Sequence, residues 1–266
     1  MFPRILEFGP ITLHSYGFLL ALAYMLAITA AAQLGVRKGI PKQRIWDIGL
    51  VVIVSALVGA KILLVLTDLE SFLNWPARLF TLEFWQAGGV YYGGFLGAVI
   101  GSAWYVNRFP DMQFWKMADA AGPAIALGQS IGRLGCLAAG CDYGKPADLP
   151  WAIKFTSEYA HRHVGVPLQI PLHPSQIYES FATFCIFLIL LWRSKKKHFD
   201  GQIFLLYLLF YSVVRFGLEF FRGDVDRGFV FGGLFSTSQF ISVIILPLSV
   251  ILYFYLHNRS VKQNLV

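Results

Sequence analysis

Long apolar runs separated by short polar segments dominate the pattern of this chain of 266 residues. Seven of these runs are long enough to cross, as α-helices, the hydrocarbon core of a bilayer, which is roughly 30 Å thick. Their approximate ranges are 14–35, 47–66, 88–106, 118–138, 176–192, 202–221 and 236–256. The fourth run is broken by the glycines and proline of AGPAIALG, a composition that is tolerated among neighbouring helices. The pattern therefore predicts an all-α, polytopic integral membrane protein with about seven transmembrane helices.

Composition supports the same class of protein. Hydrophobic residues make up 56% of the chain and charged residues only 14%, whereas a soluble domain carries about 25% charged residues. The sequence has no convincing internal repeat and no low-complexity tract. We therefore predict a single transmembrane domain over residues 1–266, with one longer loop at about 139–175.

Lysines and arginines are distributed unevenly between the two sets of loops. The loop after the first run contains Arg37, Lys38, Lys42 and Arg44, and the loop after the fifth contains RSKKKH (193–198). The opposite set of loops is longer in total but holds fewer basic residues. By the positive-inside rule the first set is cytoplasmic, so the N-terminus and the longer loop lie outside and the C-terminus lies inside. We attribute the net charge of +7 to this asymmetry and not to nucleic-acid binding, for which no motif is present.

The unusual polar residues gather at the outer ends of the predicted spans. Odd-numbered spans run inward and even-numbered spans run outward, so the start of one and the end of the next share a leaflet. The clusters that fall there are His14 with Tyr16, GGVYYGG (88–94), GRLGCLAAGCDYG (132–144), HPSQIYES (173–180), Arg215 with Glu219 and Arg222, and STSQ (236–239). At a rise of 1.5 Å per residue, Arg133 and Arg215 lie at a matching depth, about 7–9 Å below their outer span ends. The clusters therefore predict one site in the outer leaflet.

Charged residues inside an apolar span are costly and need a reason. Arg215 and Glu219 stand at i, i+4 spacing and therefore share a helix face. Arg133 and Arg222 would bring the cluster to three cations against one carboxylate. Such an excess suits a phosphate, because a guanidinium offers a planar, bidentate fork and stays protonated. This favours a lipid-headgroup pocket, while a purely structural Arg215–Glu219 pair and a snorkelling Arg222 remain open.

The glycines, tyrosines and cysteines also have simpler structural interpretations. The spacing of Gly97 and Gly101 is typical of close helix packing, which explains the segment YYGG (91–94) less well. The two tyrosines of that segment are also compatible with an aromatic belt at the membrane interface. Cys136 and Cys141 lack the partner ligands of a zinc site, so no metal is predicted. Their spacing leaves open whether they pair.

Together these motifs resemble those of the prolipoprotein diacylglyceryl transferases of bacterial inner membranes. The matching segments are LHSYG (13–17), GGVYYGGFLGA (88–98), GRLGCLAAGCDYG (132–144), HPSQIYE (173–179), YSVVRFGLEFFR (211–222) and STSQ (236–239). HPSQIYE and YSVVRFGLEFFR are specific in combination, and the resemblance covers nearly the whole chain. The family has seven spans with the N-terminus outside, in agreement with the loop charges.

The resemblance implies a reaction and a set of site residues. A diacylglyceryl group would pass from phosphatidylglycerol to the lipobox cysteine thiol of a lipoprotein precursor, with release of glycerol phosphate. The expected partners are phosphatidylglycerol, lipobox signal peptides and membrane lipids. The expected location is the bacterial inner membrane, with the site facing the outer leaflet. Neither a metal nor a cofactor is needed. The expected catalytic residues are Tyr16, Tyr92, Arg133, Arg215 and Glu219. The residues expected to bind phosphatidylglycerol are Arg133, Gly144, Tyr211, Arg215, Arg222 and His14.

Several polar side chains typical of the family are replaced in this sequence. Tyr92 stands where the family has His before its paired glycines. Cys136 and Cys141 stand where it has Asn and Glu, and Ala139 stands where it has a second Asn. These departures leave open a paralogous lipid transferase with another donor or acceptor.

The replacement of His by Tyr92 also affects which residue is expected to act as the general base. A free tyrosine has a pKa near 10, so a phenol is a poor base at neutral pH. We therefore predict that Tyr92 positions the headgroup or the thiol by its hydroxyl, and that Glu219 or His14 removes the proton. A transporter or lipid-binding protein without catalysis is a further alternative, although the repeated halves and midplane charges typical of transporters are not evident in the sequence.

Overall fold

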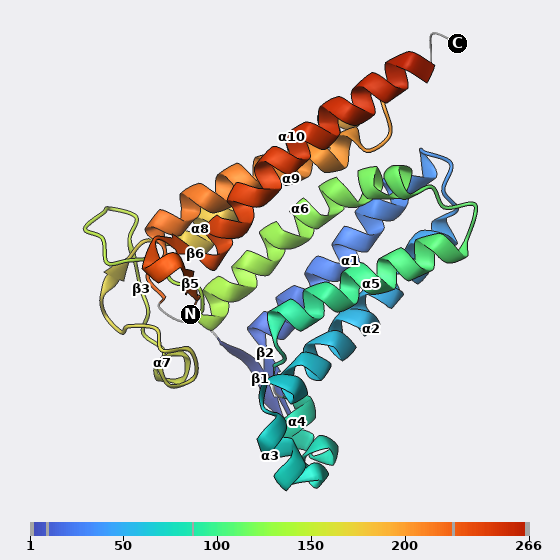
Figure 1. Cartoon of the computed structure of the whole chain (residues 1–266). Coiled ribbons are helices and arrows are strands. Elements are labelled where there is room, and N and C mark those ends of the chain that lie inside the picture. The colour runs from blue at the N-terminus through green and yellow to red at the C-terminus, as the bar shows by residue number, and fades with distance from the viewer. Residues whose placement is uncertain (1–2, 9–10, 87, 225–226, 264–266) are drawn as a thin grey trace. The chain divides into compact units, whose positions relative to one another are not determined.

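The computed structural model describes residues 3–8, 11–86, 88–224 and 227–263. Within these ranges the chain is predominantly helical, as Figure 1 shows. The long helices are α1 (Ser15–Val36), α2 (Lys42–Thr67), α5 (Tyr91–Arg108), α6 (Phe114–Ala139), α8 (Ser175–Ser194), α9 (Gln202–Leu218) and α10 (Thr237–Gln263).

Short elements connect the long helices. The short helices are α3 (Leu69–Asn74), η1 (Pro76–Phe80), α4 (Leu82–Gln86), α7 (Glu158–Val164), η2 (Glu219–Phe221) and η3 (Phe231–Gly233). The strands are β1 (Arg4–Phe8), β2 (Ile11–His14), β3 (Ile153–Lys154), β4 (Pro171–Leu172), β5 (Phe229–Val230) and β6 (Phe235–Ser236). They form three antiparallel two-stranded ribbons, in which β1 pairs with β2, β3 with β4 and β5 with β6.

Each of the seven predicted apolar runs falls on a long helix. Among the described residues, five helices are long and apolar enough to cross a membrane: α1, α2, α8, α10 and α9, the last with its continuation to Phe221. The chain is therefore a multi-pass, helical membrane protein. The full number of seven spans and the orientation of the termini stay predictions. The glycines and proline expected to break the fourth run do not end the helix, because α6 continues through Pro123.

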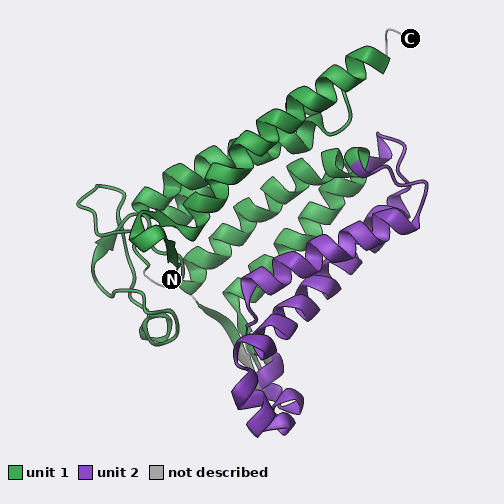
Figure 2. Cartoon of the chain, viewed as in Figure 1, with its two compact units in different colours: residues 1–34, 115–266 green, residues 35–114 purple. Residues whose placement is uncertain are grey.

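The chain divides into two compact units, coloured separately in Figure 2. Unit 2, residues 35–114, is built on the packing of α2 against α5. A Cβ atom added at Gly97 would lie 2.1 Å from the carbonyl oxygen of Ser55, and one added at Gly93 would lie 2.3 Å from that of Gly59. The packing interpretation of Gly97 and Gly101 is confirmed, and the same close contact also explains Gly93.

Unit 1, residues 1–34 and 115–266, contains α9 packed against α8 and α10. A core cluster that includes Ile186, Leu190, Ile203 and Tyr207 lies along the α8–α9 contact. Gly122 lets α6 approach the start of α9, since a Cβ atom there would lie 3.3 Å from the Cα atom of Phe204. Helices α6, α8 and α9 therefore lie close enough to share polar side chains.

The first turn of α9 is capped by a carboxylate from α6. Asp119 is fully buried, and its Oδ1 accepts hydrogen bonds from the backbone N–H groups of Ile203 (2.9 Å) and Phe204 (3.1 Å). Its Oδ2 accepts from the N–H of Gly201 (3.0 Å) and pairs with the ammonium of Lys197 (3.2 Å). These bonds satisfy N–H groups that a helix start leaves without partners, and the negative charge complements the helix dipole. Burial lowers the pKa of Lys197, but its contacts with Asp200 and Asp119 outweigh this and raise it, so the ammonium stays charged.

The segment of residues 140–174, between α6 and α8, folds around a small core of its own. Phe155, Ala160, Val166 and Leu172 are buried together there. Helix α7 begins at an N-cap serine, Ser157, whose hydroxyl accepts a hydrogen bond from the N–H of Ala160. This segment corresponds to the longer loop predicted at about 139–175.

Candidate functional site

Eight charged side chains of unit 1 form a closed ring in which arginines and carboxylates alternate. In order around the ring they are Arg133, Glu179, Arg215, Glu219, Arg227, Asp224, Arg222 and Asp142. We call this group the arginine–carboxylate ring. Each member lies within 4.0 Å of its two neighbours, so no charge in the ring stands alone.

Three helices and two connecting segments supply the ring. Arg133 lies in the penultimate turn of α6, Glu179 in the first two turns of α8, and Arg215 in the last turn of α9. Asp142 follows α6, while Glu219 starts η2 and the remaining three residues follow it. The convergence predicted for the ends of the fourth, fifth and sixth runs is therefore confirmed.

The helical half of the ring is the more deeply buried. The side chains of Glu179 and Glu219 are only 4% and 2% exposed. Glu179 Oε2 lies 3.1 Å from Arg133 Nε and 3.8 Å from Arg215 Nη1, and the Tyr211 hydroxyl donates to Glu179 Oε1 at 3.1 Å. Arg215 Nη2 lies 3.0 Å from Glu219 Oε2, which confirms the predicted i, i+4 pair. Two interior carboxylates thus hold three helices at one point.

Asp142 closes the ring on its more open side. Its Oδ2 lies 2.5 Å from Arg133 Nη1, and its Oδ1 lies 2.6 Å from Arg222 Nη2. Its side chain is 29% exposed, the largest value in the ring. Burial raises the pKa of Asp142, but the two guanidinium groups outweigh it and lower the pKa below its ordinary value. The carboxylate is therefore ionised and spans two arginines as a small oxyanion would.

Arg222 and Arg227 complete the loop side of the ring. Arg222 holds Asp224 through its Nε and Nη2 atoms, at 2.8 and 2.5 Å. Burial lowers the pKa of Arg222, but Asp224 and Asp142 outweigh this and raise it above its ordinary value. The guanidinium is therefore permanently charged. Arg227 Nε lies 2.7 Å from Glu219 Oε1, and its guanidinium stacks over the ring of Phe229 at 5.0 Å. The snorkelling alternative for Arg222 is wrong, because this residue is only 5% exposed.

The expected excess of three cations over one carboxylate is also wrong. The ring contains four arginines and four carboxylates, so its formal charges cancel. The three cations and one carboxylate of the prediction all come from the ends of the fourth and sixth runs. The prediction omitted Glu179 at the start of the fifth run and the loop residues Asp142, Asp224 and Arg227, which only the tertiary structure brings to the same place. An interior acidic residue in an apolar run was the available signal for Glu179.

Arg215 retains one donor for a further partner. The residue is 9% exposed, and its Nη2 donates to the Ser238 hydroxyl at 2.9 Å. Its Nη1 is buried and makes no hydrogen bond to any residue that the structure describes. A buried donor without an acceptor is unfavourable unless a ligand supplies one. Ser238 belongs to the STSQ segment, which the sequence also predicted to join the site.

A backbone frame holds the loop side of the ring in place. Gly144 forms an antiparallel bridge with Arg222, and the N–H groups of Lys145 and Gly223 donate to the carbonyls of Phe221 (2.8 Å) and Tyr143 (2.9 Å). A Cβ atom at Gly144 would lie 2.3 Å from the His173 carbonyl oxygen, so this position requires glycine. Gly144 therefore acts by letting two loops approach closely.

The structure does not bring every predicted residue into the ring. Tyr16 starts α1 and packs its ring against Gly135 of α6, and it is 40% exposed. His14 ends β2, and its Nε2 lies 3.0 Å from the Tyr159 hydroxyl. Tyr92 belongs to unit 2, where its ring packs edge-on against that of Tyr91 and is 45% exposed.

Two cysteines lie directly beside Asp142. The Sγ atoms of Cys136 and Cys141 and a carboxylate oxygen of Asp142 all lie within 4.8 Å of one another. Arg133 Nη1 lies 4.0 Å from Cys136 Sγ, and the Cys141 thiol donates to the Cys136 carbonyl at 3.8 Å. Neither cysteine forms a disulfide in this structure.

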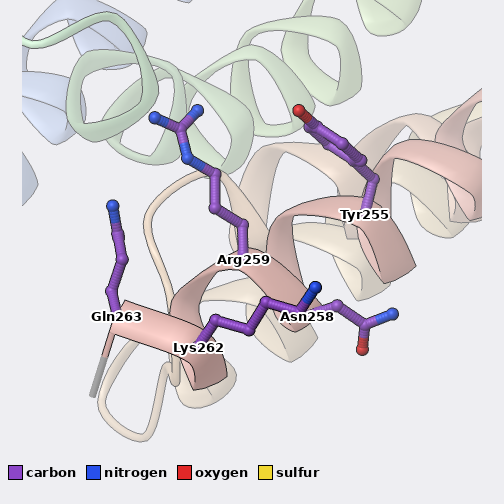
Figure 3. Close-up of a pocket in the computed structure, with 5 residues that line it drawn as sticks. All are labelled: Tyr255, Asn258, Arg259, Lys262 and Gln263. Atoms are coloured by element: carbon purple, nitrogen blue, oxygen red, sulfur yellow. The ribbon is translucent and has the colours of Figure 1, made fainter. Parts of the chain in front are cut away.

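Two open pockets lie outside the ring. One of about 800 Å³, shown in Figure 3, is lined by side chains from the last turns of α10: Tyr255, Asn258, Arg259, Lys262 and Gln263. Its basic residues lie at the end of the chain that the loop charges predict to be cytoplasmic. The other, of about 390 Å³, is lined by Ile5, Ser15, Phe18, Leu19, Leu134, Leu137 and Ala138. This second pocket is mostly apolar. Two of its lining residues, Ser15 and Leu134, are the direct sequence neighbours of Tyr16 and Arg133.

The fold and the ring define a multi-pass helical membrane protein with a buried arginine site. The sequence model of the prolipoprotein diacylglyceryl transferase family matches residues 3–255. The phosphatidylglycerol–prolipoprotein diacylglyceryl transferase of Clostridium tetani is 34% identical over 254 residues, 95% of this chain and 97% of the relative. Phosphatidylglycerol–prolipoprotein diacylglyceryl transferase 2 of Clostridium perfringens is 34% identical over 93% of this chain and 92% of the relative's length. The corresponding transferase of Vibrio parahaemolyticus is 28% identical over 98% of this chain and 93% of its own. The chain therefore belongs to the prolipoprotein diacylglyceryl transferase family.

Proposed function

We propose that this protein transfers a diacylglyceryl group from phosphatidylglycerol to the lipobox cysteine thiol of prolipoproteins and releases glycerol phosphate. Family membership over nearly the whole chain supports the reaction, and the relatives are named for these two substrates. The observation that carries the proposal for the site is Asp142, whose two oxygens bridge Arg133 and Arg222. A carboxylate in that position marks a place built for an oxyanion.

The phosphate of the lipid binds by replacing Asp142 between the two arginines. Asp142 is the most exposed member of the ring, so it can turn outward at the lowest cost. Its departure changes the local balance in favour of the cations, and the phosphate oxygens then restore it. Arg215 Nη1, which has no hydrogen-bond partner among the described residues, supplies a third donor from the buried side. Gly144 keeps the loop that holds Asp142 against Arg222, and Tyr211 orients Glu179 between Arg133 and Arg215.

The apolar pocket beside α1 and α6 takes part of the lipid tail. Its lining includes Phe18 and Leu19 from α1 and Leu134 and Leu137 from α6. Leu134 directly follows Arg133, so a headgroup on the arginine places the start of an acyl chain near this apolar surface. Burial of each methylene contributes about 0.8 kcal/mol, which favours a diacyl lipid over free glycerol phosphate.

The reaction is a displacement at the glycerol carbon that bears the phosphate. The thiolate sulfur forms a new C–S bond while the C–O bond to phosphate breaks, and the electron pair leaves with glycerol phosphate. The arginines stabilise the charge that develops on the departing phosphate. The thiol proton passes to a base, since the thiolate is the attacking form. Both oxygens of Glu219 are already paired with Arg215 and Arg227, which favours His14 of the two candidates.

The remaining expectations form part of the same proposal. The whole chain acts as one transferase domain in a bacterial inner membrane, with seven spans, the N-terminus outside and the site facing the outer leaflet. Tyr16 and Tyr92 position the headgroup or the thiol by their hydroxyls. Lipobox signal peptides bind from the membrane, and the reaction requires neither metal nor cofactor.

The test is a reconstituted transfer assay with purified protein. The protein is incubated with phosphatidylglycerol and a lipobox peptide, and mass spectrometry follows the peptide. A diacylglyceryl adduct on the cysteine, with release of glycerol phosphate in equal amount, is the expected result. A peptide with serine in place of the cysteine is the matched control. An adduct formed only with another anionic lipid would identify a paralogous transferase, and transport of lipid without any adduct would overturn the enzymatic assignment.

A further inference from the structure

The cysteine pair beside the ring is used by none of the steps above, although it adjoins Asp142 and Arg133. Cys136 lies in the last turn of α6, and Gly140 directly follows that helix with a φ of +87°. The Gly140 N–H donates to the Cys136 carbonyl at 2.8 Å, so the chain turns back over the helix end. This turn, and not sequence spacing alone, brings the Cys141 thiol to the Cys136 thiol.

We propose that Cys136 and Cys141 form a reversible disulfide that modifies the arginine site. Their Sγ atoms lie within 4.8 Å of each other, while a disulfide requires a separation of about 2.05 Å. Rotation about the Cα–Cβ bonds, with a small movement of the loop that carries Cys141, closes this distance. Arg133 Nη1 lies 4.0 Å from Cys136 Sγ, so a positive charge adjoins the pair.

The oxidant is a second disulfide, either a small molecule or a protein. Cys141 is partly exposed and Cys136 is buried, so the Cys141 thiolate attacks first and forms a mixed disulfide. The first sulfur of the oxidant leaves as a thiolate, which takes up a proton. The Cys136 thiolate then attacks Cys141 Sγ and displaces the second sulfur of the oxidant as a thiol. One S–S bond forms and one breaks, and two electrons and two protons pass from the cysteines to the oxidant.

A metal ion fits the same three residues less well. Cys136, Cys141 and Asp142 offer three ligand atoms within 4.8 Å, but both oxygens of Asp142 are already held by arginines. A divalent cation would have to displace these guanidinium groups and would be repelled by them. The hydrogen bond with Cys136 and the charge of Arg133 lower the pKa of the Cys141 thiol despite its burial, and this favours attack by the Cys141 thiolate.

Disulfide formation affects the arginine site through Asp142, because this residue directly follows Cys141. Asp142 has a φ of +59°, so its backbone conformation depends on the turn around it. A disulfide pulls Cys141 toward the end of α6 and withdraws Asp142 from Arg222. We therefore expect the oxidised form to hold the ring differently and to turn over phosphatidylglycerol several-fold more slowly. This effect on turnover rests on the proposed function, whereas formation of the disulfide does not.

The test is oxidation of the purified protein in detergent with oxidised dithiothreitol or glutathione disulfide. The chain has three cysteines, so free thiols should fall from three to the one on Cys185, and the intact mass should fall by about 2 Da for the two hydrogens lost. Dithiothreitol should restore both the thiols and the turnover. Cys185→Ser is the matched control and should form the disulfide normally. Cys136→Ser and Cys141→Ser should remain active and lose the reversible response.

Each other outcome is decisive. If all three thiols remain free under every oxidant, or if the disulfide links Cys185, the modification site is refuted. If the disulfide forms and turnover is unchanged, the link to Asp142 is wrong. If one equivalent of Zn²⁺ protects Cys136 and Cys141 together in the reduced protein, the pair is a metal site instead. An inactive reduced protein that still forms the disulfide would refute the proposed function and leave the modification site standing.

Discussion

The two ends of α9 handle buried charge in opposite ways. At its start, a single carboxylate, Asp119, accepts three backbone hydrogen bonds and pairs with one ammonium. At its end, the arginine–carboxylate ring joins eight side chains, and none of its ion pairs uses a backbone N–H group. The helix between them has 17 residues and spans about 25 Å.

This difference separates a structural charge from the charges of a candidate site. The backbone groups that bind Asp119 are fixed by the helix, so no ligand can replace them without unwinding it. The ring is made of side chains that can rotate, and its most exposed carboxylate can give way to another anion. Buried charge therefore marks a candidate site only where its partners are exchangeable.

The strongest effect on stability is expected at the start of α9. Asp119→Ala removes the cap and leaves Lys197 without its buried partner, which should lower the free energy of unfolding by about 3–5 kcal/mol. Turnover per folded molecule should change little, because Asp119 lies outside the ring. Thermal unfolding in detergent, followed by activity on the folded fraction, measures both. Asp200→Ala, which removes the more exposed partner of Lys197, is the control and should cost much less.

The next effect is expected at the other end of α9, where the ring forms the candidate site. Arg215→Ala should lower turnover about 100-fold, because it removes a donor to the leaving phosphate. Arg215→Lys should restore part of the activity, since lysine keeps the charge and loses the fork. Arg133→Ala should behave similarly. Arg259→Ala, in the pocket of Figure 3, is the control. Wild-type turnover in both ring variants would exclude the arginine site.

Two tyrosine hydroxyls on α9 differ in whether they contact the ring. Tyr207 and Tyr211 stack one turn apart, and their hydroxyls donate to Gln129 (3.0 Å) and Glu179 (3.1 Å). Tyr211→Phe should lower turnover about tenfold, the effect of losing one hydrogen bond of about 1.5 kcal/mol to a charged group. Tyr207→Phe should not, because Gln129 is outside the ring. Equal losses in the two variants would show that packing, and not the ring, explains the effect.

Tyr92 lies outside unit 1 and tests whether unit 2 contributes to the reaction. If its hydroxyl positions a substrate, Tyr92→Phe should lower turnover about threefold and evenly across pH. A pH–rate profile of the two proteins is the measurement. Loss of an apparent pKa in the variant would identify Tyr92 as the base and contradict this assignment.

The smallest effect concerns the pH dependence of stability at Asp142. Its pKa is lowered in the folded protein, so its ion pairs stabilise the fold above the unfolded pKa of about 3.9 and are lost as pH falls through the lower, folded value. Asp142→Asn should therefore lower the melting temperature by a constant amount near neutral pH. That difference should shrink only below about pH 4. A difference that widened under acid would contradict the sign of the shift.

The fold was largely predictable because apolar runs of span length have few alternative structures. All seven predicted runs fall on helices, and the Arg215–Glu219 pair followed from helical spacing alone. The ring could be predicted only in part. Glu179 was visible as an interior acid, whereas Asp142, Asp224 and Arg227 lie in loops whose paths depend on backbone contacts such as the Gly144–Arg222 bridge. Such contacts have no periodic signal in the sequence.

Closure of the ring also bears on how the protein is made. Arg215 and Glu219 lie within one short stretch and can neutralise each other as soon as α9 forms. Arg133 is synthesised 46 residues before Glu179, its buried partner on α8. A nascent chain that ended before α8 would therefore present an arginine to lipid with only Asp142 to balance it. Release of α6 into the bilayer is accordingly expected to wait for α8, so that the charges that form the site also set the order in which its helices are inserted.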